Sequence, residues 1–159
     1  MSFYSLSLLN DDRKIFLSPD DFRHFTTILE ELSGYVDVDI LAYCLMPTEL
    51  EFLVCQNQEG EVSKFIHRLT LEYNEYYFDR YKAEDVVFEN DFSIKNLQKT
   101  DIAKVSRAIH TNPKCWRDCE FSSIRAYLYD DAPDWLNRSY IRSFFNSSID
   151  YYNYLNRAV

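Results

Sequence analysis

The sequence has few of the residues that break regular structure, with only two glycines and four prolines among its 159 residues. Glycine adopts the positive φ angles of tight turns at the lowest cost, so its scarcity favours long helices and strands. No apolar run approaches the roughly eighteen residues of a membrane-spanning helix. No repeat, low-complexity tract or linker divides the chain. We therefore expect one domain over residues 1–159, with no membrane as a partner.

Signatures of common enzyme classes are also missing. The sequence contains no glycine-rich phosphate loop, no G-x-S-x-G and no Cys/His catalytic pair. Cys115 and Cys119 have no second Cys/His pair nearby, so idle or buried thiols are expected there rather than a zinc site. The three histidines are isolated, and we assign none as a metal ligand or general base: His24, His67 and His110.

The N-terminus has no basic stretch ahead of an apolar core, so it does not have the pattern of a secretory signal. A cytoplasmic location with reduced thiols is therefore expected.

Positive charge is scarce as well, since 17 Lys and Arg stand against 26 Asp and Glu, for a net charge of −9. Nucleic-acid binders usually have a basic balance, so this acidity counts against DNA and anionic membranes, although a local basic groove is compatible with it. Hydrophobic residues, by contrast, reach 47% and aromatic residues 17%. That composition excludes a disordered chain and predicts a dense aromatic core or an exposed aromatic surface.

Hydrophobic spacing predicts the order of the elements. Strands are expected at residues 3–9, 36–46, 49–55 and, less regularly, 86–94. Helices are expected at residues 19–33, 60–82, 100–110, 122–129 and 139–155. The order β-α-β-β-α-β is that of the ferredoxin-like split β-α-β fold. We therefore predict an α+β domain with an antiparallel sheet and additional C-terminal helices.

Five segments in order resemble one protein family. They are ILAYCLMP at residues 40–47, YNEYYFDRY at 73–81, VFENDF at 87–92, AIHTNP at 108–113 and FSSIRAYL at 121–128. Together they resemble the REP-associated tyrosine transposases and their IS200-like relatives, the single-tyrosine HUH transposases. The resemblance covers roughly residues 3 to 136.

This resemblance implies a homodimer that cuts and rejoins single-stranded or hairpin DNA. Two histidines, two residues apart on a strand, would bind a divalent metal that polarises the scissile phosphate. A tyrosine on the helix before the NP motif would attack that phosphate.

The chain departs from this pattern at the residues that cut DNA. The two histidine positions are occupied by Glu49 and Glu51, and residues 101–108 contain no tyrosine. Ser106 is a conceivable hydroxyl in that helix, but nothing nearby suggests how it would be activated. Acids also replace basic residues of the family pattern, at Glu72, Glu75, Asp79 and Asp91. We therefore expect a degenerate transposase domain that has lost DNA cleavage.

Two interpretations of Glu49 and Glu51 stay open. Residues two apart on a strand share one face, and a carboxylate pair suits Mg²⁺ or Mn²⁺, which prefer oxygen ligands. Alternatively, both glutamates face solvent on an antiparallel strand. No cofactor is expected, and a metal there would not restore cleavage without a nucleophile.

The aromatic residues also allow two interpretations. Tyr73 and Tyr77 lie one helical turn apart and either stack on bases or pack in the core. The aromatic C-terminal helix, residues 137–159, is appended to the domain and either closes the core or forms a dimer or partner contact.

Three functions follow. The first is a transposase-derived domain that still binds DNA, using cations at Arg68, Arg80, Lys82, Lys104, Arg107 and Lys114. The second is a repurposed dimeric interaction or regulatory module that binds no nucleic acid, which the acidic balance supports. The third, ranked last, is a surviving enzyme with altered chemistry at Glu49 and Glu51.

Overall fold

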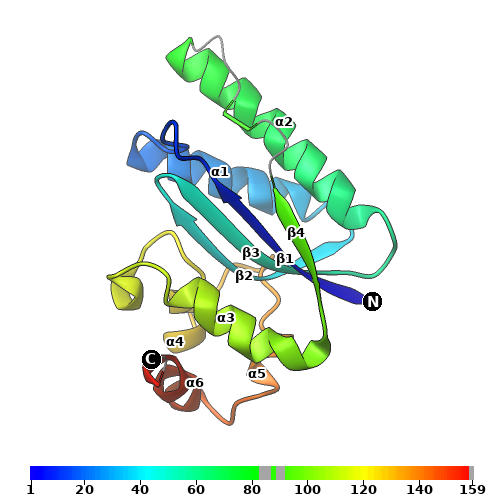
Figure 1. Ribbon diagram of the computed structural model, residues 1–159, viewed down its shortest axis with the longest axis vertical. Coiled ribbons are helices and arrows are strands. Elements are labelled where there is room, and N and C mark those ends of the chain that lie inside the picture. The colour runs from blue at the N-terminus through cyan, green and yellow to red at the C-terminus, as the bar shows by residue number, and fades with distance from the viewer. Residues whose placement is uncertain (83–86, 89–91, 158–159) are drawn as a thin grey trace.

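The computed structural model describes residues 1–82, 87–88 and 92–157 of the chain (Figure 1). Its four strands are β1 (Ser2–Leu9), β2 (Val38–Met46), β3 (Glu49–Gln56) and β4 (Ser93–Leu97). They form one sheet in the order β2-β3-β1-β4, and every neighbouring pair is antiparallel. This is the strand order of a ferredoxin-like sheet, and it confirms the predicted α+β fold.

Helices cover both faces of the sheet (Figure 1). On one face lie α1 (Pro19–Leu32) and the long α2 (Glu61–Tyr81). On the other lie α3 (Ile102–His110), α4 (Ile124–Leu128), α5 (Ser139–Arg142) and α6 (Ser148–Asn156). Two short 3₁₀ turns, η1 (Lys99–Asp101) and η2 (Trp116–Asp118), precede and follow α3. None of the helices in the described residues is long and apolar enough to cross a membrane.

The central strands are buried on both faces because helices pack on each side. In β3, every residue from Phe52 to Cys55 is fully buried, and β2 is buried from Ile40 to Leu45. On the α1 and α2 side, Phe16, Phe25 and Tyr73 form a cluster of ring contacts over the sheet. The aromatic-rich composition is therefore largely accounted for by a core of interlocking rings.

The two edges of the sheet differ. At the β2 edge, residues 121–123 run alongside the strand, where Ser122 bridges to Cys44 and the Ser123 amide donates to the Tyr43 carbonyl at 2.9 Å. The β4 edge has no further described strand beside it, and residues 93–96 are exposed. One edge is thus covered by the chain itself and the other faces solvent.

Two of the expected elements differ from the structure. The single C-terminal helix predicted over residues 139–155 is wrong, because α5 ends at Arg142 and α6 begins only at Ser148. The Ser147 side chain accepts a hydrogen bond from the Asp150 amide and so starts a new helix.

The fourth strand lies later than predicted, at Ser93–Leu97 rather than from residue 86. Val87 and Phe88 are buried against the core but lie outside any strand, and residues 86 and 89–91 of the predicted strand are outside the described residues.

Candidate functional site

Glu49 and Glu51 lie at the N-terminal end of β3, at the positions where the resemblance places two metal-binding histidines. Both side chains are partly buried, and in the sheet Glu51 lies opposite Cys44 of β2 and Ser7 of β1. One carboxylate oxygen of Glu51, Oε2, is buried without a hydrogen-bond partner. A buried, unpartnered carboxylate oxygen is costly, so this pair is under electrostatic strain.

The raised pKa of Glu51 is consistent with that strain. Burial, followed by the charge and hydrogen bond of Glu49, raises the pKa of Glu51 to about 7. Asn112 lowers this pKa slightly, and its amide also donates to Glu49 Oε1 at 3.4 Å. Near neutral pH Glu51 is therefore partly protonated, because burial and a neighbouring like charge both disfavour its ionised form.

The pair does not provide a complete metal centre. Within the described part of the chain, no three His, Cys, Asp or Glu side chains gather in a way that could hold a metal ion. The oxygen donors of Glu49 and Glu51 are of the type that Mg²⁺ and Mn²⁺ prefer, and Oε2 of Glu51 has no hydrogen-bond partner. Since the described residues supply no third ligand of these types, the donor set that they form fits a resident metal poorly.

Ser106, the only hydroxyl in the helix that should carry the nucleophile, is fully buried on α3. Its Oγ donates to the Ala103 carbonyl at 2.8 Å and accepts a hydrogen bond from the Tyr151 hydroxyl at 3.0 Å. With both roles taken and no exposure, this hydroxyl does not reach a phosphate.

A buried polar chain continues from Ser106 through His110. Nδ1 of His110 lies 2.6 Å from the Tyr151 hydroxyl, and Nε2 lies 2.6 Å from Ser123 Oγ. Burial lowers the pKa of His110 to about 3, so the imidazole is neutral. This network of hydrogen bonds joins α3, the start of α4 and α6, and has a structural role. Sequence reasoning left His110 unassigned, because Tyr151 is 41 residues away along the chain.

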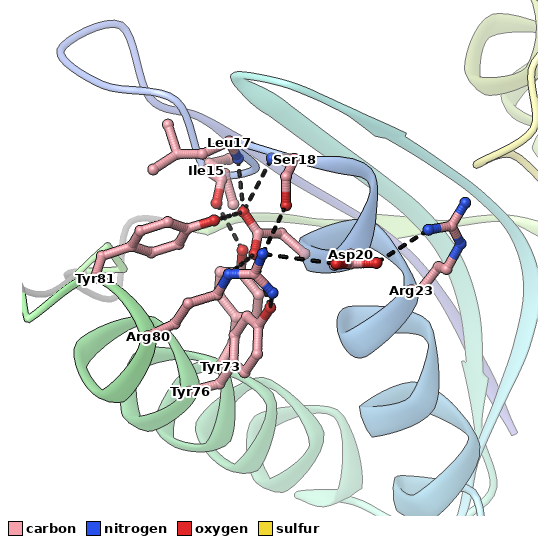
Figure 2. Close-up of polar contacts among 10 residues, drawn as sticks. Ile15, Leu17, Ser18, Asp20, Arg23, Tyr73, Tyr76, Arg80 and Tyr81 are labelled. Carbon is pink, nitrogen blue, oxygen red and sulfur yellow. Dashed lines mark hydrogen bonds and ion pairs between the residues drawn. The ribbon is translucent and has the colours of Figure 1, made fainter.

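Tyr73 and Tyr77 are buried, at 0% and 6% exposure, so neither ring is open to a nucleobase. The Tyr73 hydroxyl donates to the Ile15 carbonyl at 2.7 Å. Figure 2 shows Tyr73, Tyr76, Arg80 and Tyr81 reaching from α2 toward the segment before α1. The segment that resembles a basic family motif thus packs one helix against another.

The focus of this cluster is Asp21, which is fully buried at the first turn of α1. Its carboxylate accepts hydrogen bonds from the hydroxyls of Tyr76 and Tyr81 at 2.7 and 2.6 Å. The amides of Leu17 and Ser18 also donate to it, at 2.8 and 3.1 Å. Burial alone would raise the pKa of Asp21, but these four hydrogen bonds together lower it.

The six predicted DNA-binding cations fall on opposite sides of the sheet. Arg68, Arg80 and Lys82 belong to α2 or its C-terminal cap, whereas Lys104 and Arg107 lie on α3, shortly before Lys114. On α2, Arg68 pairs with Glu72 at 3.5 Å, and Arg80 pairs with Asp20 and Asp21 at 3.6 Å. Arg68 and Arg80 therefore already have acidic partners, and the six cations do not form one groove.

The second group belongs to a longer basic segment, which we define as residues 93–117. It contains six cations and one acid, Asp101; the cations are Lys95, Lys99, Lys104, Arg107, Lys114 and Arg117. The four lysines form no ion pair with a described carboxylate and are exposed. Sequence reasoning missed three of these cations because the net charge of the whole chain hides the local balance.

Aromatic rings lie beside the arginines of the basic segment. The Arg107 guanidinium stacks 4.3 Å from the ring centre of Tyr154 on α6. The Arg117 guanidinium stacks 4.3 Å from the ring centre of Trp116, and its Nε donates to the Tyr152 hydroxyl at 3.3 Å. The α3, η2 and α6 elements therefore present cations next to planar groups.

Comparisons with known proteins give the fold. A scan against protein-family models and a search of curated proteins find no match. Among solved structures, the REP-associated tyrosine transposase bound to a REP hairpin is similar, with a TM-score of 0.65 and 14% identity over 86% of this chain and 85% of that chain. The chain has the fold of a REP-associated tyrosine transposase.

A second solved structure supports the same fold. It is described as a "putative transposase" from Deinococcus radiodurans R1, and it matches with a TM-score of 0.51 and 13% identity over 70% of this chain and 91% of that chain. The predicted resemblance to these transposases is therefore confirmed at the level of the fold. The identities are low, so the roles of individual residues depend on the site itself.

Proposed function

We propose that this transposase-fold protein binds single-stranded or hairpin DNA without cutting it. The observation that carries the proposal is the basic segment, residues 93–117, whose exposed lysines are free of described acidic partners while the rest of the chain is acidic. Free cations release counterions from a phosphate backbone, whereas cations already paired with carboxylates do so poorly.

The proposed loss of cleavage rests on two sets of residues, those at the metal-binding positions and those on the helix that should carry the nucleophile. The metal positions hold two glutamates instead of histidines, and the pKa of Glu51 is raised to about 7 by burial and by Glu49. On α3, the only hydroxyl is that of buried Ser106, which has two hydrogen-bond partners of its own. A strand cut needs both a phosphate-polarising centre and a free nucleophile, and neither position supplies one.

The aromatic neighbours of the basic segment suit unpaired strands. Arginine planes and aromatic rings both stack on nucleobases that are not held in a duplex. Tyr152 is 37% exposed, and its hydroxyl already contacts Arg117. Lys104 and Arg107 lie on successive turns of α3, so they face one side of the helix together.

The test is a fluorescence-anisotropy titration with a labelled DNA hairpin across a salt series. We expect a charge reversal, Lys104→Glu with Arg107→Glu, to weaken binding at least tenfold and to reduce the salt slope by roughly two. The matched control is Lys64→Glu with Arg68→Glu on α2, which should change affinity less than threefold. Equal losses in both variants, or no binding at low salt, would overturn the assignment of the surface.

Cleavage is tested in the same samples. We expect no nicked product from a single-stranded or hairpin substrate with Mg²⁺ or Mn²⁺ present. Metal-dependent nicking that disappears in Glu49→Ala would contradict the proposed loss of activity.

An interaction module that binds no nucleic acid is the second candidate, and one observation favours it. Leu71 and Phe78, two turns apart on one side of α2, are 53% and 52% exposed, although both are large apolar side chains. Dimerisation, which the resemblance implies, stays a prediction. Light scattering that shows a dimer disrupted by Leu71→Ser with Phe78→Ser, together with absent DNA binding, would favour this candidate.

A further inference from the structure

We propose that a cavity lined by α4, α5, α6 and the connection between the last two helices binds a small planar aromatic molecule that carries one anionic group. The cavity measures about 260 Å³, a volume that suits a ligand of one or two rings. Its described lining residues all lie outside the basic segment, residues 93–117, so the proposal does not depend on DNA binding.

One side of the cavity comes from the break in the C-terminal segment. α5 ends at Arg142, α6 begins at Ser148, and residues 145–148 at this break line the cavity. The Ser147 hydroxyl accepts a hydrogen bond from the Asp150 amide at 3.1 Å, and the Asp150 carboxylate accepts one from the Asn146 amide at 3.2 Å. These two bonds fix the start of α6 and therefore the shape of this side of the cavity.

The inner wall of the cavity is apolar. Tyr127 and Tyr151 are each 2% exposed, and Ile141 is fully buried. The Phe145 ring meets the Tyr151 ring edge to face, with the ring centres 4.8 Å apart. A planar ring that enters the cavity would therefore pack against aromatic side chains that already hold one another in place.

The hydroxyl groups of the two tyrosines are bound outside the cavity. The Tyr127 hydroxyl donates to the Leu41 carbonyl on β2. The Tyr151 hydroxyl lies 2.6 Å from Nδ1 of His110 and donates to Ser106 Oγ at 3.0 Å. The tyrosines thus offer ring surface rather than hydroxyl groups to a molecule in the cavity, which favours an aromatic ligand over a sugar-like one.

The polar side of the cavity suits an anion. Arg142 is the charged side chain among the described lining residues. Its Nη2 donates to Asp130 Oδ1 at 2.8 Å, and Arg138 donates to the same oxygen, so two guanidinium groups share one carboxylate. Within the described part of the chain, the other N–H groups of Arg142 and the side-chain amide of Asn146 have no hydrogen-bond partner. These donors fit a carboxylate or phosphate oxygen.

The experiment is an NMR titration of the full chain with two ligands of the same shape, indole-3-acetate and the uncharged indole-3-acetamide. We expect indole-3-acetate to bind with a Kd below about 1 mM, and the amide to bind at least fivefold more weakly because it lacks the charge. Absence of binding, or equal affinities for the two ligands, would overturn the proposal.

Arg142→Gln tests the anionic end of the site. We expect this variant to weaken indole-3-acetate about tenfold and indole-3-acetamide less than twofold, a difference that a general loss of structure would not produce. The matched control is Arg23→Gln on α1, since Arg23 is also exposed and pairs with an aspartate, Asp20, at 3.1 Å. Equal losses in the two arginine variants would contradict the role of Arg142.

Ser148→Phe tests the location. The larger side chain fills the cavity from the start of α6, so we expect neither indole ligand to bind, while circular dichroism matches that of the parent protein. Unchanged affinity would place the ligand elsewhere and overturn the assignment. Should Arg142→Gln fail to fold, the preference of the parent protein for the acid over the amide, together with Ser148→Phe, still decides the question.

Two sources could supply the same chemistry, a free aromatic anion or one unpaired nucleotide of a bound strand. Displacement of indole-3-acetate by an excess of DNA hairpin would assign the cavity to a nucleotide. Undiminished binding of indole-3-acetate in the presence of the hairpin would assign it to a free molecule. Both results support a site for an aromatic anion and identify its source.

Discussion

Two acids, the fully buried Asp21 and the partly buried Glu51, lie on opposite sides of the sheet and have opposite electrostatic environments. Asp21 accepts four hydrogen bonds, and these lower its pKa despite full burial. Glu51 keeps one buried oxygen without a partner, and its pKa is raised to about 7. A carboxylate that is fully hydrogen-bonded stabilises a fold, whereas one left partly unpaired beside a like charge retains reactivity toward protons or ligands.

The largest effect is expected from Asp21→Ala. This change leaves two tyrosine hydroxyls and two amides without their acceptor, and we expect the free energy of unfolding to fall by about 2–4 kcal/mol. Urea denaturation at neutral pH measures it. The exposed neighbour Asp20→Ala should change stability by less than about 0.5 kcal/mol. A loss under about 1 kcal/mol in Asp21→Ala would mean that the cluster is dispensable.

Glu51→Gln should act in the opposite direction. Because the folded pKa of Glu51 is raised from 4.5 to about 7, its ionised form opposes folding above that pH. We expect a gain of about 1–2 kcal/mol in the free energy of unfolding at pH 8, after allowance for partial exposure, and little change at pH 5. Destabilisation at pH 8 would show that the charge has a structural partner, and the comparison with Asp21 would fail.

The pH dependence of the parent protein should show both acids at once. Between about pH 4.5 and 7 the folded state binds more protons at Glu51 than the unfolded state does, so stability should fall as pH rises through this window. Asp21 has the opposite sign: its contribution is present above its ordinary pKa of 3.8 and is lost as pH falls through its lowered value.

Urea unfolding midpoints measured at half-unit pH steps, in the parent protein and in Glu51→Gln, would test this assignment. If the fall in stability toward neutral pH persists in Glu51→Gln, it is caused by another group.

The smallest effect is expected from Tyr81→Phe. It removes one of the four hydrogen bonds to Asp21 and leaves the ring in place, so the cost should be about 1 kcal/mol. Phe78→Tyr adds a hydroxyl to an exposed ring of the same helix and should be neutral. Urea denaturation of both variants would show whether the hydrogen bonds to Asp21 contribute separately or as a unit.

Much of the fold follows from local patterns in the sequence. The helix at Pro19–Leu32 starts where Ser18 and Asp21 form a capping box, and the long α2 ends within one residue of its prediction. The C-terminal helix was mispredicted because its apolar spacing continues across a break that Ser147 caps. Hydrophobic spacing reports which face is buried, but a cap decides where a helix starts.

The site could be predicted only in part. The positions of Glu49 and Glu51 follow from strand alternation and the resemblance, since both are local. The contact of His110 with Tyr151 joins residues far apart in the sequence, and no spacing rule predicts it. The direction in which a tyrosine points also depends on the tertiary fold, which is why Tyr73 allowed two interpretations until its burial was seen.

The open β4 edge has a consequence for the behaviour of the protein in concentrated solution. An uncovered strand offers unpaired amides and carbonyls that another chain could extend into a continuous sheet, the first step toward aggregation. Lys95 lies in the middle of this exposed strand and Lys99 follows it, so two copies approaching edge to edge would bring like charges together. The same lysines that make the segment attractive to polyanions thus also keep the molecules apart from one another.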